Sequence, residues 1–252
     1  MFCEHHTFLD AFGGSGVVLL KKEPAKVDVW NDLSKEVYNF FYCLRNHPEE
    51  TMKAIEFTPF HREEFNQSLS QSEDPVEQAR RTFVKQTMGF SGKQRQTKGN
   101  FGGAIKKSSN HMSAKVSQYL SNIRNLYDVI ERLKTVQIEC LPALECIKKY
   151  DHEELLVYVD PPYLPETRKT QGTYEEEMTY EDHEELGELL NNIQGKAVVS
   201  GYDSQLYNDM FKAWNKTEIK NVPVSAHKRE KVNHEKRTEV VWTNYEQLLC
   251  GH

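Results

Sequence analysis

Three short apolar segments of this chain each run into a polar residue that can carry chemistry. They are His6–Leu9 before Asp10, Val27–Trp30 before Asn31 and Asp32, and Leu155–Val159 before Asp160. Short apolar runs bounded by polar residues predict buried strands. Ligands of an open α/β sheet bind outside the carboxyl ends of its strands, so this pattern predicts such a sheet with a binding site along one edge.

The rest of the chain supplies the other elements of an α/β fold. Further strands are predicted at Val136–Cys140, Lys196–Ser200, Glu218–Val222 and Thr238–Thr243, and helices at Val17–Leu20, Glu36–Leu44, Val116–Ile130 and His183–Ile193. Residues 58–134 show little strand pattern. We therefore expect a mainly helical lobe of residues 58–134, inserted into a sheet domain of residues 1–57 plus 135–252.

Composition excludes several other classes of protein. The 252 residues are 38% hydrophobic and 28% charged, which suits one or two soluble domains. No apolar run approaches the roughly 20 residues of a membrane span, and the N-terminus does not read as a signal peptide. The five cysteines form no CxxC pair and the ten histidines no HExxH motif, so no metal site is predicted. We expect a cytoplasmic protein without a membrane segment.

Positive charge is concentrated in one segment, although the whole chain carries a formal net charge of −6. From Arg80 to Lys115 there are nine Lys or Arg residues and no Asp or Glu, interspersed with Phe, Gly and polar side chains. A solvated surface usually mixes both signs, so a block of one sign favours contact with a polyanion, and this mixture of residues is typical of nucleic-acid binding. The residues expected to make these contacts are Arg80, Lys85, Lys93, Arg95, Lys98 and Lys106.

A glycine-rich turn follows the first predicted strand. It comprises Asp10, Ala11, Phe12, Gly13, Gly14, Ser15 and Gly16. Glycines let a ligand approach the backbone closely, and the following helix N-terminus favours negative charge. The turn is not the dinucleotide fingerprint, because Leu19 stands where a third glycine is required. Asp32 follows Gly16 by 16 residues, near the ~20 expected for a carboxylate that binds a ribose, although a role as N-cap of the next helix would explain it equally well.

The most specific motif is Asp160-Pro161-Pro162-Tyr163, directly after an apolar strand. The prolines end the strand and fix φ near about −65°, so the carbonyls of Asp160 and Pro161 point in a defined direction. The carboxylate and the Pro161 carbonyl can accept the two N–H bonds of an exocyclic amino group, while the Tyr163 ring stacks on the ring that bears it. A plain turn would explain the prolines but not the Asp and Tyr beside them.

The order of these motifs resembles that of the Dam-like (D12 class) DNA adenine-N6 methyltransferases, and looks closest to the phage-type members. That order is a turn of the FxGxG kind, here Phe12–Gly16, then an inserted DNA-recognition lobe, then DPPY, here Asp160–Tyr163. The likeness extends over nearly the whole chain, through Asn31-Asp32, Thr58–Phe60, Arg62–Phe65, Tyr174–Glu185, Ser200–Asp203 and Arg237–Tyr245.

The resemblance implies a Rossmann-like, S-adenosylmethionine-dependent methyltransferase that methylates N6 of adenine in double-stranded DNA after base flipping, without a metal. Asp160, Pro161, Pro162 and Tyr163 would be catalytic. The cofactor would be bound by Asp10, Ala11, Phe12, Gly13, Gly14, Ser15, Gly16, Asp32, Cys140 and Asp160, with Cys140 near its adenine. The segment Leu164–Tyr180 would close over the site. A prokaryotic or phage-encoded enzyme is expected, and a role in restriction-modification, phage self-protection or regulation is left open, as is the oligomeric state.

One part of the family pattern is missing. Members usually begin with an aromatic-x-Gly-Gly-Lys segment well before the turn, whereas only nine residues precede Asp10 here. The alternative is therefore a catalytically silent DNA-binding module or partner subunit. A cytosine-N4 methyltransferase would grip an amino group in the same way but more often resembles SPPY, and an RNA or protein-glutamine methyltransferase resembles an N-P-P-Y site without a basic inserted lobe.

Overall fold

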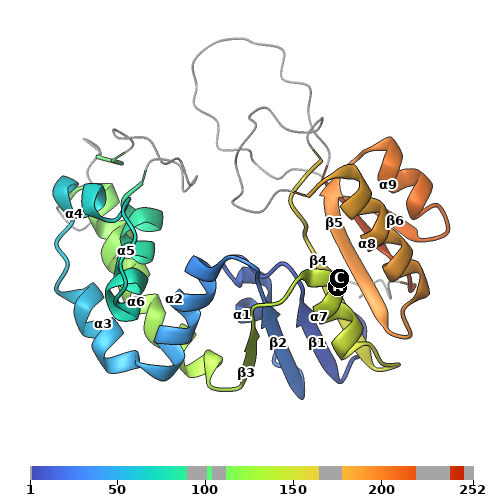
Figure 1. Cartoon of the computed structure of the whole chain (residues 1–252), viewed down its shortest axis with the longest axis horizontal. Coiled ribbons are helices and arrows are strands. Elements are labelled where there is room, and N and C mark those ends of the chain that lie inside the picture. Colours follow the sequence, from blue (N-terminus) through green and yellow to red (C-terminus); the bar gives the residue numbers. More distant parts are fainter. Residues whose placement is uncertain (1, 90–100, 104–111, 165–177, 220–238, 247–252) are drawn as a thin grey trace, which may run out of the picture.

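The computed structural model describes residues 2–89, 101–103, 112–164, 178–219 and 239–246, and it contains a seven-stranded sheet (Figure 1). The strands are β1 (Thr7–Asp10), β2 (Val27–Asn31), β3 (Val136–Glu139), β4 (Leu155–Val159), β5 (Lys196–Tyr202), β6 (Asn215–Ile219) and β7 (Glu239–Thr243). Their order is β3-β2-β1-β4-β5-β7-β6. The first five pair in parallel, and β7 runs antiparallel to both β5 and β6. The predicted Rossmann-like α/β sheet is therefore confirmed.

All seven predicted strands occur, and the sixth differs most from its expected bounds. It begins at Asn215 rather than Glu218, because its pairing with β7 extends to the register pair Asn215↔Thr243. The Asn215 side chain also donates a hydrogen bond to the Tyr245 carbonyl at 2.9 Å. Long-range pairing thus sets an end that the local apolar pattern does not show.

The helices of the described residues connect these strands, and several of them form a helical lobe. They are α1 (Val17–Lys21), α2 (Lys35–Asn46), α3 (Pro48–Glu56), α4 (Arg62–Gln67), α5 (Pro75–Met88), α6 (Ala114–Leu133), α7 (Ala143–Tyr150), α8 (Tyr180–Asn192) and α9 (Gln205–Met210). Capping explains some of the bounds: α8 starts before the predicted His183 because Thr179 and Asp182 form a capping box. None of the helices in the described ranges is long and apolar enough to cross a membrane.

The sheet has a hydrophobic cluster on each face. Successive side chains of a strand point to opposite faces. Phe8, Trp30 and Leu156 pack with apolar residues of α1, α2, α5 and α6, whereas Leu9 and Val157 pack with α7, α8 and α9. The core of the helical lobe is therefore continuous with one face of the sheet, and Figure 1 shows α3 to α6 gathered at one side of it.

The lobe contains helices from before residue 58 as well as after it. Helix α5 makes contacts with α2, α3, α4 and α6, so α2 and α3 belong to the same helical unit by packing. The division of the chain at residues 57 and 134 stays a prediction, because contiguous packing does not itself define a domain boundary.

A buried ionic cluster joins the end of the lobe to the sheet. The side chain of Asp28 on β2 is 1% exposed and lies 2.8 Å from Lys22 Nζ and 2.5 Å from an Arg132 guanidinium nitrogen. Arg132 is in the last turn of α6, so the segment that returns from the lobe is fixed against β2. Two cations surround one buried carboxylate, and removing the carboxylate would leave both of them without a counter-charge in this cluster.

Candidate active site

Three carboxyl groups meet at the carboxyl ends of neighbouring strands. Asp10 ends β1, Asp32 follows β2, and Asp160 follows β4. Strand β1 lies between the other two, and Asp10 is in parallel register with Trp30 and Tyr158. The structure therefore brings these three residues, all predicted from the sequence, to one edge of the sheet.

Burial disfavours the charged forms of all three acids, and nearby negative charge adds to the effect at Asp10 and Asp160. Asp10 is 2% exposed, and burial together with the charges of Asp160 and Asp32 raises its pKa to about 7. Burial, with a contribution from the charge of Glu239, raises the pKa of Asp160 to about 6. Burial also raises the pKa of Asp32, although backbone N–H groups of Ser34 and Gly14 oppose the shift. A cation placed among these groups would favour their ionised forms.

The glycine-rich turn is held by backbone hydrogen bonds. Gly13 N–H donates to the Asn31 carbonyl at 2.8 Å, and Gly16 N–H donates to the Gly13 carbonyl at 2.7 Å. Gly14 and Gly16 adopt left-handed φ values of 47° and 66°, which glycine reaches without strain. A methyl group on Gly13 would lie 2.2 Å from Trp30 Nε1, so only glycine fits there. The turn thus presents backbone rather than side chains at this position.

Asp32 ties this turn to the helix that follows β2. Its Oδ2 accepts a hydrogen bond from Gly14 N–H at 2.7 Å, and its Oδ1 accepts one from Ser34 N–H at 2.8 Å. The N-cap of α2 is Ser34, whose hydroxyl accepts from Val37 N–H, so the alternative of Asp32 as the cap is wrong. A carboxylate oxygen has more than one acceptor site, so Asp32 keeps capacity for a ligand hydroxyl.

Asn31, to which the sequence analysis gives no role, joins the turns after β1 and β3. Its side chain is buried, with Nδ2 donating to the carbonyls of Ala11 at 3.0 Å and Leu141 at 3.1 Å, and Oδ1 accepting from Leu141 N–H at 2.9 Å. Three bonds from one amide hold the two walls of the site at a fixed separation. A polar residue at the end of an otherwise apolar strand is the signal that could have indicated it.

The Asp160–Tyr163 segment lies beside aromatic side chains of β4 and β5. The Tyr163 ring centroid is 4.6 Å from that of Tyr202, with an interplanar angle of 44°. Burial and the charge of Asp160 raise the pKa of Tyr158 to about 12. Tyr202, at the end of β5, is not among the predicted site residues, although its ring contacts that of the predicted residue Tyr163. Most of the segment Leu164–Tyr180, expected to close over the site, lies outside the described residues.

Cys140 lies next to Asp32, and its predicted role beside the cofactor adenine stays a prediction. Its Sγ is 3.8 Å from the Leu33 carbonyl oxygen. Burial, followed by the charge of Asp32, raises the pKa of the Cys140 thiol, so it is a neutral group at the border of the site. Neutral, half-buried side chains suit the edge of a pocket for a ring.

The predicted nucleic-acid contacts divide into two groups. Lys93, Arg95, Lys98 and Lys106 lie outside the described residues. Arg80 and Lys85 lie on α5 and form ion pairs within the lobe: Arg80 with Glu64 at 2.6 Å and Glu77 at 2.7 Å, and Lys85 with Glu36 at 2.6 Å. Hydrogen bonds from Arg80 help lower the pKa of Glu77 to about 2. The charges of these two cations are compensated inside the lobe, and their contact with DNA stays a prediction.

A comparison with known families identifies the arrangement. The family model of the D12 class N6 adenine-specific DNA methyltransferases matches residues 2–238, and so includes the glycine-rich turn, the inserted lobe and Asp160–Tyr163. No curated protein matches the chain. The family match supports adenine N6 over cytosine N4 as the target, and the matched family is a family of enzymes. The chain belongs to the D12 class of N6 adenine-specific DNA methyltransferases, enzymes that transfer a methyl group from S-adenosylmethionine to N6 of adenine in DNA.

Proposed function

We propose that residues Asp160 to Tyr163 bind an adenine flipped out of double-stranded DNA and activate its N6 atom for methyl transfer. The observation that carries the proposal is the meeting of Asp160, the Tyr163–Tyr202 ring pair and Asp10 beside the glycine-rich turn, at the edge of the sheet where β1 and β4 end. An adenine within a duplex cannot reach a recessed strand end, so the base has to leave the stack.

Asp160 and Pro161 would act on the amino group by hydrogen bonding. The N6 lone pair is delocalised into the adenine ring, which makes it a poor nucleophile. Two N–H bonds, to the Asp160 carboxylate and the Pro161 carbonyl, favour a tetrahedral nitrogen whose lone pair is free to attack. When bound, S-adenosylmethionine would supply an electrophilic methyl group on a positively charged sulfur, and its carbon–sulfur bond would break as the N6–carbon bond forms, leaving neutral S-adenosylhomocysteine. After attack the nitrogen carries a surplus proton, which the adjacent Asp160 carboxylate is placed to accept.

The glycine-rich turn and the three acids fit a cationic cofactor. The turn residues Asp10 to Gly16 offer close backbone approach, and Asp32 keeps acceptor capacity for ribose hydroxyls. Asp10 and Asp160, once ionised, would supply negative charge to a cationic cofactor, and Cys140 would border the cofactor adenine. This fit depends on the carboxyl groups and the backbone of the turn, which already lie together at the strand ends.

Cofactor affinity is expected to rise with pH. Asp10 has a pKa of about 7 in the free protein, so most of it is protonated at pH 6 and has to lose that proton before a cation benefits from its charge. S-adenosylmethionine should therefore bind about tenfold tighter at pH 8 than at pH 6, with proton release on binding. Calorimetry in buffers of different ionisation enthalpy measures both quantities. Asp10→Asn should flatten the profile, and a flat profile in the unaltered protein would contradict the assignment.

Stacking by Tyr163 tests the flipped-base part of the proposal. Tyr163→Ala is expected to lower kcat/KM for duplex DNA by roughly 10- to 100-fold, since stacking of one base on an aromatic ring contributes about 1 to 3 kcal/mol. Tyr163→Phe keeps the ring and should stay close to the unaltered enzyme. The assay measures N6-methyladenine in duplexes of mixed sequence, and then the fluorescence of 2-aminopurine at the adenine identified. Equal activity of the Ala and Phe variants would argue against stacking.

A further inference from the structure

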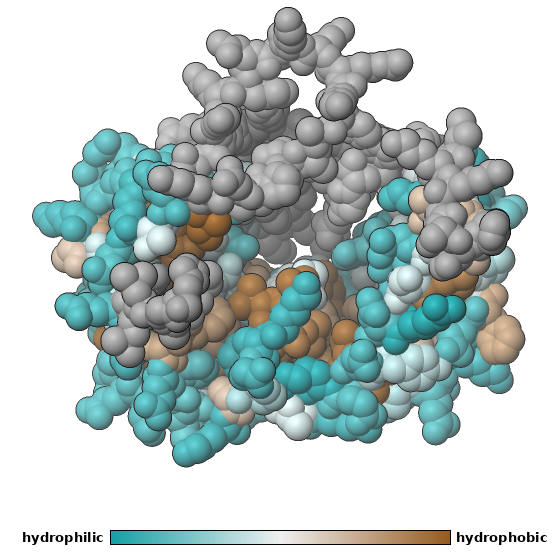
Figure 2. Space-filling model, turned by 180° about the vertical axis from the view of Figure 1, so that it is seen from behind, coloured by the Kyte–Doolittle hydropathy of each residue, from teal (hydrophilic) through white to brown (hydrophobic). Residues whose placement is uncertain are grey.

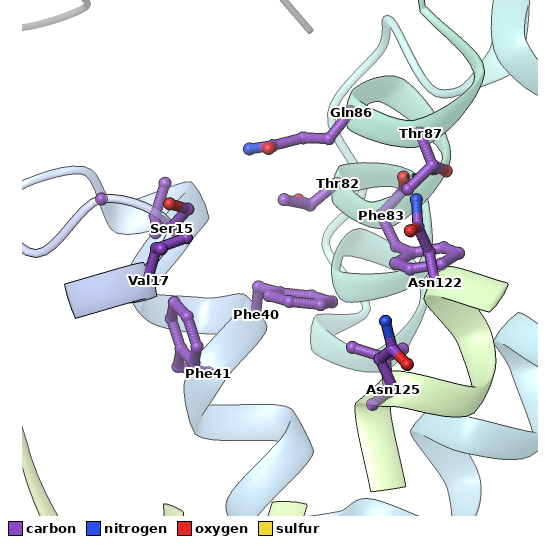
Figure 3. A pocket seen from close by; sticks show the side chains of 13 residues that line it. Ser15, Val17, Phe40, Phe41, Thr82, Phe83, Gln86, Thr87, Asn122 and Asn125 are labelled. Carbon is purple, nitrogen blue, oxygen red and sulfur yellow. Dashed lines mark hydrogen bonds between the residues drawn. The ribbon is translucent and has the colours of Figure 1, made fainter. Parts of the chain in front are cut away.

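A cavity lies between the glycine-rich turn and the helical lobe (Figure 3). Its volume is about 410 Å³, within the range of small-molecule sites. Residues of the turn, α1, α2, α5 and α6 line it. It shares only Gly14 and Ser15 with the residues assigned to the cofactor, and Asp10, Asp32, Cys140 and Asp160 are not part of its lining. The cavity therefore adjoins the site at the strand ends and meets it at Gly14 and Ser15.

The bottom of this cavity is aromatic. Phe40 and Phe41 come from α2 and Phe83 from α5, and the last two are almost fully buried. The Phe40 and Phe83 rings are nearly parallel, with an interplanar angle of 19° and centroids 6.4 Å apart. Figure 2 shows hydrophobic residues gathered in the middle of the molecule between hydrophilic flanks. Phe41 and Phe83 are covered by their neighbours, so the half-buried Phe40 is the ring that offers a face on which a planar ligand can stack.

Neutral amides and hydroxyls form the polar part of the lining. Thr82, Thr87 and Asn122 already have hydrogen-bond partners, at Gln78, Phe83 and Gln118 respectively. Within the described ranges, the side chains of Gln86 and Asn125 have none, and Figure 3 shows both at the cavity. Each amide offers a donor and an acceptor together.

The absence of charge in this lining narrows the class of ligand. Among the described residues, no Asp, Glu, Lys or Arg lines the cavity, so a phosphate, carboxylate or ammonium group would lie there without compensation. Stacking faces combined with paired donors and acceptors suit a neutral heteroaromatic ring, and amide side chains are the usual partners of adenine. Both amides are exposed and can be reached from outside, whereas a ring that stacks on Phe40 inside the cavity has to leave its own base stack.

We propose that this cavity binds a second unstacked nucleobase of the DNA substrate, in addition to the adenine at Asp160. The inference rests on the proposed function for its DNA substrate. Its occupant would contact Ser15 and Gly14, and Gly14 N–H is the group that Asp32 holds. A base in the cavity is therefore connected to the turn that would bind the cofactor.

The test uses the full chain, with excess S-adenosylhomocysteine to keep nucleosides from the cofactor site. Saturation-transfer NMR measures binding of the four deoxynucleosides to the unaltered protein and to Gln86→Leu/Asn125→Leu. Both altered side chains are exposed and without hydrogen-bond partners in the described ranges, so the variant should fold. The expected result is binding of at least one nucleoside, weakened roughly tenfold or more in the double variant. Asn66→Leu, an exposed amide on α4 that does not line the cavity, should bind as the unaltered protein does.

Several results would overturn the proposal. They are no transfer to any nucleoside at millimolar concentration, equal binding by the double variant, and loss of binding in Asp160→Ala, which would place the nucleoside at the methylation site. These readings do not need methyl transfer, so they stand even if the proposed roles of Asp160 and Tyr163 fail. In the duplex assay, the double variant should have a higher KM for DNA and an unchanged kcat. An unchanged KM would mean that the cavity binds only free nucleosides, and this would overturn the proposal that it binds a base of the DNA substrate.

Discussion

Asp160→Asn is expected to lose most methyl transfer while the protein stays folded. The amide has the shape of the carboxyl group but no negative charge, and it offers the adenine amino group at best one weaker acceptor. We expect kcat to fall by about 10² to 10⁴, the range for removing a positioned electrostatic or acid–base group. Stability should be equal or higher at pH 8, because the raised pKa of about 6 means that folding disfavours the charged carboxylate as pH rises through that value.

Single-turnover transfer of labelled methyl groups measures this effect apart from product release. Calorimetric binding of S-adenosylmethionine to Asp160→Asn separates loss of chemistry from loss of cofactor. Asp209→Asn, on the exposed side of α9, is the matched control and should retain full activity. Transfer by Asp160→Asn within about tenfold of the unaltered enzyme would remove Asp160 from its proposed role.

Gly13→Ala is expected to have the largest effect on stability. The added methyl would lie 2.2 Å from Trp30 Nε1 and 2.5 Å from Cδ1, and Trp30 is 1% exposed, with Phe41 packed against its ring. A buried indole cannot move aside without shifting its neighbours, so the clash should cost about 3 kcal/mol or more. The same shift would displace the turn and weaken S-adenosylmethionine binding. Urea unfolding and calorimetry measure the two consequences.

Gly14→Ala separates a clash from backbone strain. Gly14 has a left-handed φ, but a methyl there would have no neighbour closer than 4.0 Å. Strain alone should cost about 1 to 2 kcal/mol. Adding Trp30→Leu to Gly13→Ala should recover part of the lost stability relative to Trp30→Leu alone. Equal urea midpoints for Gly13→Ala and Gly14→Ala would show that the Trp30 side chain moves aside at little cost in stability.

The sheet and the strand-end acids could be predicted because their signals are local. Each buried strand is a short apolar run, and the polar residue that ends it lies at the site edge by geometry alone. Leu155–Val159 is observed with its predicted bounds. Helices α3, α7 and α9 were not predicted, because short amphipathic segments such as Ala143–Tyr150 are stabilised by packing on the sheet rather than by a long periodic pattern.

The features that sequence did not indicate depend on residues distant along the chain. Arg80 and Lys85 lie in a block without acids, yet Glu64 and Glu36 reach them from α4 and α2. A charge count along the sequence cannot include partners that folding brings in. The cavity likewise takes its lining from four separate helices and one turn. Asn31 contacts Leu141, 110 positions later, so its three hydrogen bonds become visible only in the folded chain.

The position of β7 has a consequence for how the protein forms in the cell. This strand follows β5 and β6 along the chain but lies between them in the sheet, and β6 pairs with no other strand among the described residues. During synthesis, the parallel part of the sheet can assemble while β5 still exposes an unpaired edge with apolar residues such as Val199. Such edges promote pairing between nascent chains. The yield of native enzyme should therefore depend on how fast Glu239–Thr243 inserts once it leaves the ribosome.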